Sequence, residues 1–448
     1  MSTLALRRLG VGTKTRKKSK AKARRATVST EYNMLLTATL CLLALGAVMV
    51  FSASSTTRIL QDGGLSDSAF YLKRTLIFGA VGLVIMHVVA RTQLVAIRRL
   101  TPILLGGSLF LLVVVLGIGS NVNGASRWIS AGPLQIQPSE LVKVALILYG
   151  ADMLARRPRR ARSIEGFMPF LLVTAGTCGL IMLQPDMGTT MVIVFAVGAT
   201  LVAAGAQPRD LGKIALAIGV GALLMAIVEP YRMARLTSFL HPTDSAEGAG
   251  FQAAQAKIAL GSGGPLGVGI GNGVQKAFYL PEAHTDMISA VIGEELGMVG
   301  IIGVVGLFGM LGYAGLKVAQ KAKDNYGKLL VAGLTSLIVI QAIINLFAVM
   351  GLAPLTGVPL PFVSYGNSSL MATLFAVGLI LNVARGGTGG AASASPGSGA
   401  GKLRIVDNRA KRTGERSRAS GARKAKGGGR SGRNGGPRRT GPSGRRRA

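Results

Sequence analysis

The chain has little charge, few aromatic residues and almost no cysteine for its length. Only 15% of its 448 residues are charged and 49% are hydrophobic, which excludes a soluble globular protein and indicates an integral membrane protein. Its two cysteines, Cys41 and Cys178, lie in apolar stretches and are interpreted as packing residues rather than as a disulfide or metal pair. No cleavable signal peptide is expected, because the first apolar stretch is long enough to span the membrane.

Ten apolar segments follow one another along the sequence. A helix needs roughly 20 mostly apolar residues to cross about 30 Å of hydrocarbon. The candidate segments are 34–54, 75–90, 102–119, 138–155, 167–184, 188–205, 213–229, 287–316, 328–350 and 366–384. We therefore predict an all-α polytopic membrane protein with ten transmembrane helices and a large outer loop between the seventh and the eighth.

The basic residues predict the orientation of these helices. Most of the 51 Lys and Arg fall before the first segment, after the last, or in alternate connections between them. Cytoplasmic loops of membrane proteins carry such an excess of Lys and Arg. The distribution therefore predicts an even number of spans with both termini in the cytoplasm.

Both ends of the chain are basic and rich in Gly, Ser, Arg and Lys. We predict that 1–33 and 385–448 are disordered cytoplasmic tails and that 34–384 forms the membrane domain. Most of the net charge of +33 belongs to the tails. Attraction to anionic lipid, at about 1 kcal/mol per basic residue near the surface, is the favoured interpretation. No nucleic acid is expected as a partner, because the tails lack an aromatic-interleaved binding motif.

Two predicted outer segments, 120–137 and 230–286, are long enough to carry function. The glycine-rich stretch at 259–273 lacks G-x-G-x-x-G spacing and follows no strand, which excludes a nucleotide-binding loop. Its glycines are expected to permit tight turns and close approach of the backbone to a ligand.

Proline marks irregular backbone near the outer edge of the membrane. Such backbone is tolerated there only where it lines a cavity or packs against protein. The residues concerned are Pro185, Pro354, Pro359 and Pro361.

Asp286 is the main catalytic candidate, because it lies where the large outer loop meets the eighth apolar segment. Two interpretations remain open. Thr285 or Asp286 directly before an apolar helix is a common N-cap. A carboxylate at the membrane edge is equally suited to act as a general base.

Further ionisable residues lie inside the predicted spans, where they either pair with one another or line a polar cavity. Glu294 and Glu295 follow Asp286 by about two helical turns, roughly 12 Å along the axis. Glu140 and Lys143 lie one turn apart and can form an ion pair. A structural role is as well supported as a catalytic one for all four.

The outer segments also contain candidate substrate-binding residues. Trp128, the only tryptophan, belongs either to the interfacial aromatic belt or to a surface that stacks on a sugar ring. Arg235, Lys257 and Lys276 are suited to a phosphate group, although ordinary solvated loop charges would look the same. Asp186 either caps the sixth span or binds a cation.

Eight strings in these segments together resemble the SEDS family of cell-wall proteins (shape, elongation, division and sporulation). They occur in family order across roughly 34–384, which makes the resemblance specific. The strings lie at 124–129, 137–143, 184–189, 235–242, 250–264, 280–287, 292–297 and 359–369. The long basic tails and the A-S-R-W string favour the division branch over the elongation branch.

The resemblance implies a ten-helix peptidoglycan glycosyltransferase that polymerises lipid II at the division septum of the bacterial cytoplasmic membrane. Its expected partners are a class B penicillin-binding transpeptidase and other division proteins. Asp286 matches the essential acid of the family. Trp128 and Lys143 also match family positions, and His284 is expected to orient Asp286.

The remaining candidates for substrate binding are Arg235, Lys257, Lys276 and Glu294. No protein-bound metal centre is expected. A divalent cation, Mg²⁺ or Mn²⁺, is an alternative source of positive charge for the departing diphosphate. Two rival functions stay open: a lipid II flippase, and a non-enzymatic division scaffold that recruits partners through its tails.

Overall fold

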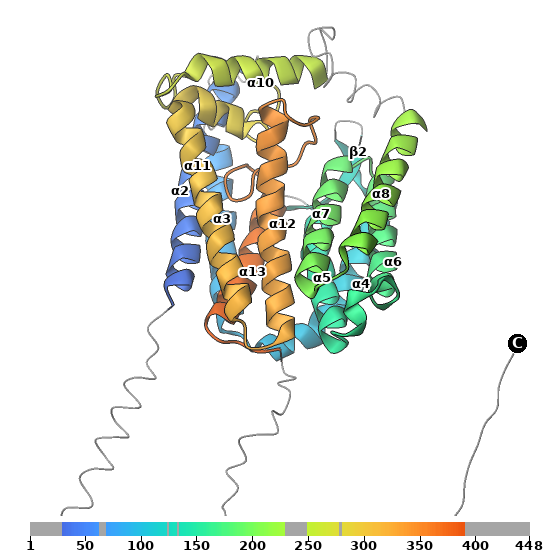
Figure 1. Ribbon diagram of the computed structural model, residues 1–448. Coiled ribbons are helices and arrows are strands. Elements are labelled where there is room, and N and C mark those ends of the chain that lie inside the picture. Colours follow the sequence, from blue (N-terminus) through green and yellow to red (C-terminus); the bar gives the residue numbers. More distant parts are fainter. Residues whose placement is uncertain are drawn as a thin grey trace, which may run out of the picture. The chain divides into compact units, whose positions relative to one another are not determined.

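The computed structural model describes residues 29–61, 69–122, 125–131, 134–228, 249–276 and 280–389 (Figure 1). Arg235 and nearly all of the two predicted tails lie outside these residues. The predictions made for them, and the domain boundaries at 33 and 385, therefore stay predictions.

Each of the ten predicted segments coincides with a long helix, because each is an apolar run long enough to form one. The helices are α2 (Thr30–Gln61), α3 (Phe70–Arg91), α4 (Leu94–Ile118), α5 (Pro138–Arg156), α6 (Ile164–Met182), α7 (Met187–Ala204), α8 (Pro208–Val228), α11 (Ile288–Lys321), α12 (Asn325–Val349) and α13 (Asn367–Ala384). A further helix, α10 (Ala249–Gly263), belongs to the large loop. The mostly helical polytopic fold is confirmed.

Eight of the described helices are long and apolar enough to cross a membrane. The two others that match predicted segments are α5 and α8, so the count of ten stays a prediction. Helix α5 carries Glu140, Lys143 and Asp152, and all three are buried. It packs against α4, α7, α12 and α13, so its charges face protein rather than lipid.

The outer surface of the helix bundle is strongly apolar. Large hydrophobic side chains are more than half exposed on α3, α4, α6, α8 and α11, and a soluble protein would bury them. Examples are Ile77, Val84, Ile103, Phe110, Leu172, Leu216 and Ile302. Together with the family described below, these helices identify an integral membrane protein.

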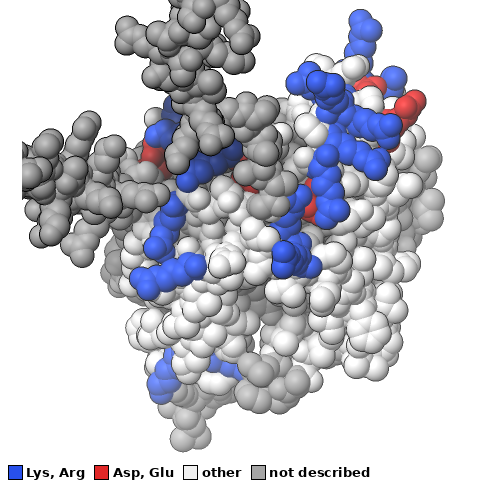
Figure 2. All heavy atoms as spheres, turned by 90° about the horizontal axis from the view of Figure 1, so that it is seen from below, with Lys and Arg blue, Asp and Glu red and all other residues white. Residues whose placement is uncertain are grey.

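The two ends of the bundle differ in charge. Helix α10 lies across one end (Figure 1). The opposite end includes the junctions α3–α4, α5–α6, α7–α8 and α11–α12, which are the connections predicted to be cytoplasmic. Figure 2 shows Lys and Arg side chains gathered on that end. This arrangement is what the positive-inside pattern predicts.

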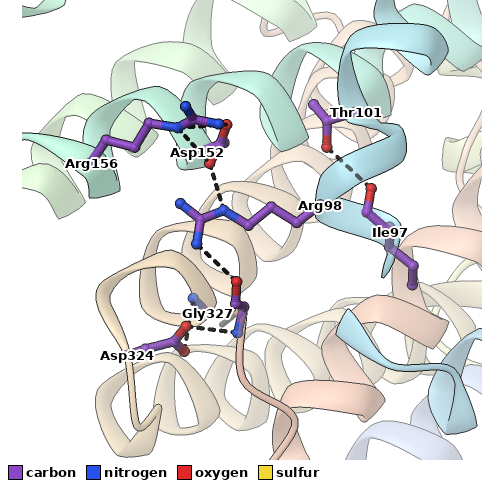
Figure 3. Close-up of polar contacts among 8 residues, drawn as sticks. Ile97, Arg98, Thr101, Asp152, Arg156, Asp324 and Gly327 are labelled. Carbon is purple, nitrogen blue, oxygen red and sulfur yellow. Dashed lines mark hydrogen bonds and ion pairs between the residues drawn. The ribbon is translucent and has the colours of Figure 1, made fainter. Parts of the chain in front are cut away.

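A polar cluster around the buried Asp152 fastens helices together at the basic end (Figure 3). Arg98 of α4 donates to Asp152 of α5 at 2.6 Å and to the backbone oxygen of Gly389 at 2.8 Å. Arg156 also donates to Asp152, at 2.7 Å. Asp324, the N-cap of α12, accepts from the backbone N–H of Gly389 at 2.8 Å. The segment that follows α13 is thereby attached to α4 and α12.

The first outer segment contains a small antiparallel sheet, which the all-α prediction did not include. Its strands are β1 (Ser120–Val122), β2 (Ala125–Ala131) and β3 (Leu134–Ile136), in that order. Runs this short show no clear alternation of apolar and polar residues. Ser368 of α13 attaches the sheet: its hydroxyl accepts from Gln137 N–H at 3.1 Å and donates to the Gln135 oxygen at 3.0 Å.

The proline-rich connection 350–366 between α12 and α13 is irregular and largely buried. Val358 is 3% exposed and Val363 0%. Helices α2 and α7 approach it so closely that a side chain at Gly46 or Gly188 would come within 2.5 Å of its atoms. The prediction that this irregular backbone packs against protein is confirmed.

Candidate functional site

Asp286 lies at the α10 end of the bundle, two residues before α11, and its side chain is half-buried. The N-cap of α11 is Met287, which makes no side-chain capping bond. The Thr285 hydroxyl donates instead to a Glu282 carboxylate oxygen at 2.9 Å. The N-cap position of α11 thus belongs to Met287 rather than to Thr285 or Asp286.

Asn345 of α12 fixes the backbone at Asp286. Its side-chain amide donates to the backbone oxygens of Asp286 at 2.7 Å and Val358 at 2.8 Å. Its oxygen accepts from the hydroxyl of Ser289 at 2.9 Å. One buried amide thus joins α11, α12 and the irregular connection. A β-carbon placed on Gly357 would lie 3.8 Å from the Asp286 carboxylate, so that connection borders the acid directly.

Lys143 of α5 is linked to the same irregular connection through Gln341 of α12. Its ammonium is buried and donates to Glu140 at 3.0 Å and to the Gln341 side-chain oxygen at 2.8 Å. The Gln341 amide donates in turn to the backbone oxygen of Pro359 at 3.0 Å. The predicted Glu140–Lys143 pair is confirmed. Gln341 and Asn345 lie one turn apart on α12. Gln341 contacts Lys143 and Asn345 contacts the backbone of Asp286, so this face of α12 connects the two sites.

His284 packs in an aromatic cluster on the α3 side of the loop. Its ring centroid lies 4.6 Å from that of Tyr71 and 5.6 Å from that of Tyr365. The backbone N–H of Tyr365 donates to the His284 oxygen at 2.9 Å. The Arg74 guanidinium lies 5.1 Å from the centroid of the Phe70 ring. The cluster holds His284, two residues before Asp286, against α3 and the connection that precedes α13.

The two lysines of the large loop have different surroundings. Lys257 is exposed on α10, and a β-carbon on Gly351 would come within 2.8 Å of its ammonium. It therefore lies over the start of the irregular connection. Lys276 is 2% exposed and forms an ion pair with Glu295 at 2.6 Å. The interpretation of Lys276 as an exposed charge is wrong, because the carboxylate that balances it comes from the interior of α11.

Glu294 is also directed into protein. One carboxylate oxygen accepts from the backbone N–H groups of Val274 at 2.7 Å and Gln275 at 3.1 Å. The structure thus gives Glu294 and Glu295 the structural partners that the sequence left open. The glycine-rich stretch lies against the backbone of α11.

Trp128 is half-buried in β2 and opposes Ser120 of β1. Beside it, Arg127 donates to the backbone oxygens of Gln184, at 2.9 Å, and of Pro185. Asp186 caps α7 by accepting from the Thr189 N–H at 3.0 Å. Of its two predicted roles, capping is confirmed.

Within the described ranges, no group of three or more His, Cys, Asp and Glu side chains gathers into a metal site. An apolar cavity of about 400 Å³ lies among α3, α4, α5 and α13. Val144, the neighbour of Lys143, belongs to its lining. Other lining residues are Ile85, Leu104, Leu111, Leu141 and Phe375.

Sequence reasoning missed Asn345, Gln341 and the aromatic partners of His284. The two amides had a usable signal, since polar residues four apart inside an apolar span occupy one face and need partners there. Tyr71 and Tyr365 had none, because they lie almost three hundred residues apart.

These features define a polytopic membrane protein with a carboxylate site at one end of its bundle, held by buried polar side chains and irregular backbone. Residues 32–388 match the family described as cell cycle protein, whose members include FtsW, RodA and SpoVE. The chain belongs to this family, which is the SEDS family that its motifs resemble.

Relatives of the chain match over most of its length. It is 42% identical to the probable peptidoglycan glycosyltransferase FtsW of Trichlorobacter lovleyi, over 80% of this chain and 94% of that protein. It is 41% identical to the stage V sporulation protein E of Bacillus subtilis, over 79% of this chain and 96% of that protein.

Two solved structures share the fold. One belongs to a study of polymerisation and crosslinking by a peptidoglycan synthase complex, with a TM-score of 0.66 and 32% identity over 79% of this chain and 97% of that chain. The other is the rod shape determining protein RodA of Thermus thermophilus, with a TM-score of 0.58 and 29% identity over 79% and 96%.

Proposed function

We propose that this protein is a peptidoglycan glycosyltransferase that polymerises lipid II during septal cell-wall synthesis. Relatives at about 40% identity carry the name of that activity, and the fold is that of a chain from a peptidoglycan synthase complex. The observation that carries the proposal is the position of Asp286. Its backbone is fixed by Asn345, its side chain is half-buried beside the irregular connection, and it lies at the membrane edge.

In the proposed reaction Asp286 is the general base. It removes the proton from the 4-hydroxyl of the acceptor GlcNAc, whose oxygen attacks C1 of the donor MurNAc. The C1–O4 bond forms as the bond from C1 to the diphosphate breaks, and the configuration at C1 inverts. The bonding electrons leave with undecaprenyl diphosphate, and the proton stays on Asp286. General-base catalysis of this kind contributes about 10²- to 10⁴-fold.

The leaving diphosphate needs positive charge more than it needs a proton. Lys257 is suited to supply it, because it is exposed on α10 above the irregular connection. Arg235, outside the described residues, is a second candidate. A Mg²⁺ or Mn²⁺ ion that enters with the diphosphate would add charge without a protein metal site. The apolar cavity beside Lys143 is suited to a prenyl chain.

The proposed setting is the bacterial cytoplasmic membrane at the septum, with the α10 end outside and both termini inside. The charge difference between the two ends of the bundle supports this orientation. A class B penicillin-binding transpeptidase is the proposed partner, because the synthase complex with the same fold couples polymerisation to crosslinking.

Polymerisation of labelled lipid II by the purified protein and its transpeptidase tests the proposal. Asp286→Asn should abolish glycan formation while membrane insertion is retained. Glu282→Gln is the matched control, since it neutralises an exposed acid of the same loop, and it should polymerise normally.

The rival functions predict other outcomes. A flippase would keep transport when Asp286 is neutralised and lose it when Lys143 is replaced. A scaffold would depend on the C-terminal tail more than on any loop residue. Normal polymerisation by Asp286→Asn would remove Asp286 from the role of base.

A further inference from the structure

Helix α11 is broken at Gly297, close to the candidate site. The backbone there has φ 65° and ψ −160°, which only glycine adopts without strain. Residues 288–296 therefore form a short separate helix, with Asp286 just before its first turn. A helix this short is not stable by itself. Its position must come from whatever it packs against.

The glycine-rich segment 264–276, here called the strap, supplies the hydrogen bonds that the break removes. The carbonyls of Glu294 and Glu295 accept from Val268 and Gly269 N–H of the strap, both at 3.0 Å. Beyond the break, Met298 N–H donates to the Gly264 oxygen at 3.0 Å, and Val299 N–H donates to the Pro265 oxygen at 3.2 Å. The strap thus completes the backbone hydrogen bonding of α11 on both sides of Gly297.

Close approach makes this contact specific. A β-carbon on Gly267, whose φ is +81°, would lie 2.1 Å from the Glu295 oxygen. One on Gly263 would lie 2.0 Å from the Gly293 oxygen. The strap and the short helix therefore pack backbone against backbone, so a shift of one shifts the other.

Side chains attach the far end of the strap to the short helix. The Lys276 ammonium donates to Glu295 at 2.6 Å, to the Ser52 hydroxyl at 2.9 Å and to the Gly271 oxygen at 2.9 Å. Ser52 of α2 donates to the same carboxylate at 2.7 Å. Glu295 is 1% exposed. This buried cluster of Ser52, Lys276 and Glu295 joins α2, the strap and the short helix at one point.

We propose that the Ser52–Lys276–Glu295 cluster sets the position of the short helix and thereby of Asp286, so that all three are positioning residues for glycan polymerisation. Asn345 holds Asp286 from the α12 side, and the cluster holds the same helix from the α2 side. Because a displacement of about 1 Å in a catalytic group costs about 10²-fold in rate, loosening the cluster lowers kcat. It leaves KM unchanged, since all three side chains are buried and bond to one another.

The test is a double-variant cycle with labelled lipid II polymerisation as the readout. Lys276→Met and Glu295→Gln each leave one buried group without its ionic partner, and each should lower kcat about 10²-fold with KM within about threefold. The double variant removes both charges together. The kcat of the double variant should be about 10²-fold below that of the wild type, whereas independent effects would lower it about 10⁴-fold.

The inference rests on the proposed function, and the cycle separates the two. If the wild-type protein makes no glycan, the proposed function fails. If the wild type polymerises but Glu295→Gln keeps its kcat while Lys276→Met raises KM, Lys276 is a substrate contact and only the positioning role is overturned. The positioning role is also overturned if the losses of kcat in the two single variants multiply in the double variant.

Two further variants guard against simple misfolding. Ser52→Ala removes the two hydrogen bonds of the hydroxyl, to Glu295 and from Lys276, without leaving a charge unpaired, and kcat should fall about fivefold. Asp152→Asn breaks the ion pairs with Arg98 and Arg156 at the other end of the bundle. It should destabilise the protein yet leave kcat within about threefold of the wild type. An equal loss of kcat in Asp152→Asn would contradict the positioning role.

Discussion

Replacement of Asn345 by leucine should separate the support of Asp286 from the stability of the bundle. The side chain is 2% exposed and makes three hydrogen bonds, to the oxygens of Asp286 and Val358 and from the Ser289 hydroxyl. Leucine is of similar size, so it creates no large cavity, but it leaves all three groups without this partner. At about 1 kcal/mol each, the free energy of unfolding should fall by about 3 kcal/mol.

The effect on catalysis should exceed the effect on stability. Without Asn345 the turn that carries Asp286 is no longer attached to α12, and a shift of about 1 Å there lowers kcat about 10²-fold. The assay is polymerisation of labelled lipid II, normalised to the amount of folded protein. Thermal unfolding in detergent gives the stability change in the same preparation.

Asn382→Leu is the matched control. Asn382 is also buried and its amide donates to two backbone oxygens, those of Val89 at 2.7 Å and Thr92 at 2.6 Å. It lies at the basic end, far along the bundle from Asp286. Asn382→Leu should lower the free energy of unfolding by about 2 kcal/mol and leave kcat unchanged. Equal losses of kcat in Asn345→Leu and Asn382→Leu would refute the idea that Asn345 supports the acid specifically.

Two further predictions test the surroundings of the site. Gly267→Ala places a β-carbon 2.1 Å from the Glu295 oxygen at a φ of +81°, so it should displace the strap and lower kcat at least about tenfold. Gly261→Ala, which meets open space on α10, should be neutral in the same polymerisation assay. Lys143→Met leaves Glu140 buried without its ionic partner and should lower the free energy of unfolding by about 3–5 kcal/mol. Adding Glu140→Gln should recover part of that loss in thermal unfolding. No recovery in the double variant would contradict a simple ion pair.

The sequence predicted those parts of the fold that depend on local composition. Apolar runs located the helices, since length and hydropathy decide what crosses a membrane. The spacing of Glu140 and Lys143 predicted their ion pair, because residues three apart on a helix share one face. Asp186 was recognised as a possible cap from its place directly before an apolar run. All of these inferences use neighbours in the chain.

Long-range contacts were not accessible in the same way. Gly267 and Gly297 meet backbone to backbone, yet glycine inside an apolar helix is common and does not by itself indicate a break. The partner of Lys276 lies on α11, and the hydroxyl that completes the cluster comes from α2. The sequence therefore offered Lys276 as a phosphate ligand or as an ordinary loop charge, while the structure contains a buried ion pair. Two of the three partners of Asn345 are backbone oxygens, which have no sequence signature, so only its spacing from Gln341 gave a signal.

The central claim is that Asp286 accepts the proton of the attacking hydroxyl, and single-turnover polymerisation tests it most directly. Wild type, Asp286→Asn and Glu282→Gln are each bound to the transpeptidase and mixed, with enzyme in excess, with labelled lipid II, and the rate of the first glycosidic bond is measured. The rate with Asp286→Asn should fall by about 10²- to 10⁴-fold with substrate binding unchanged, while Glu282→Gln matches the wild type. A first-bond rate for Asp286→Asn within about threefold of the wild type would contradict the claim.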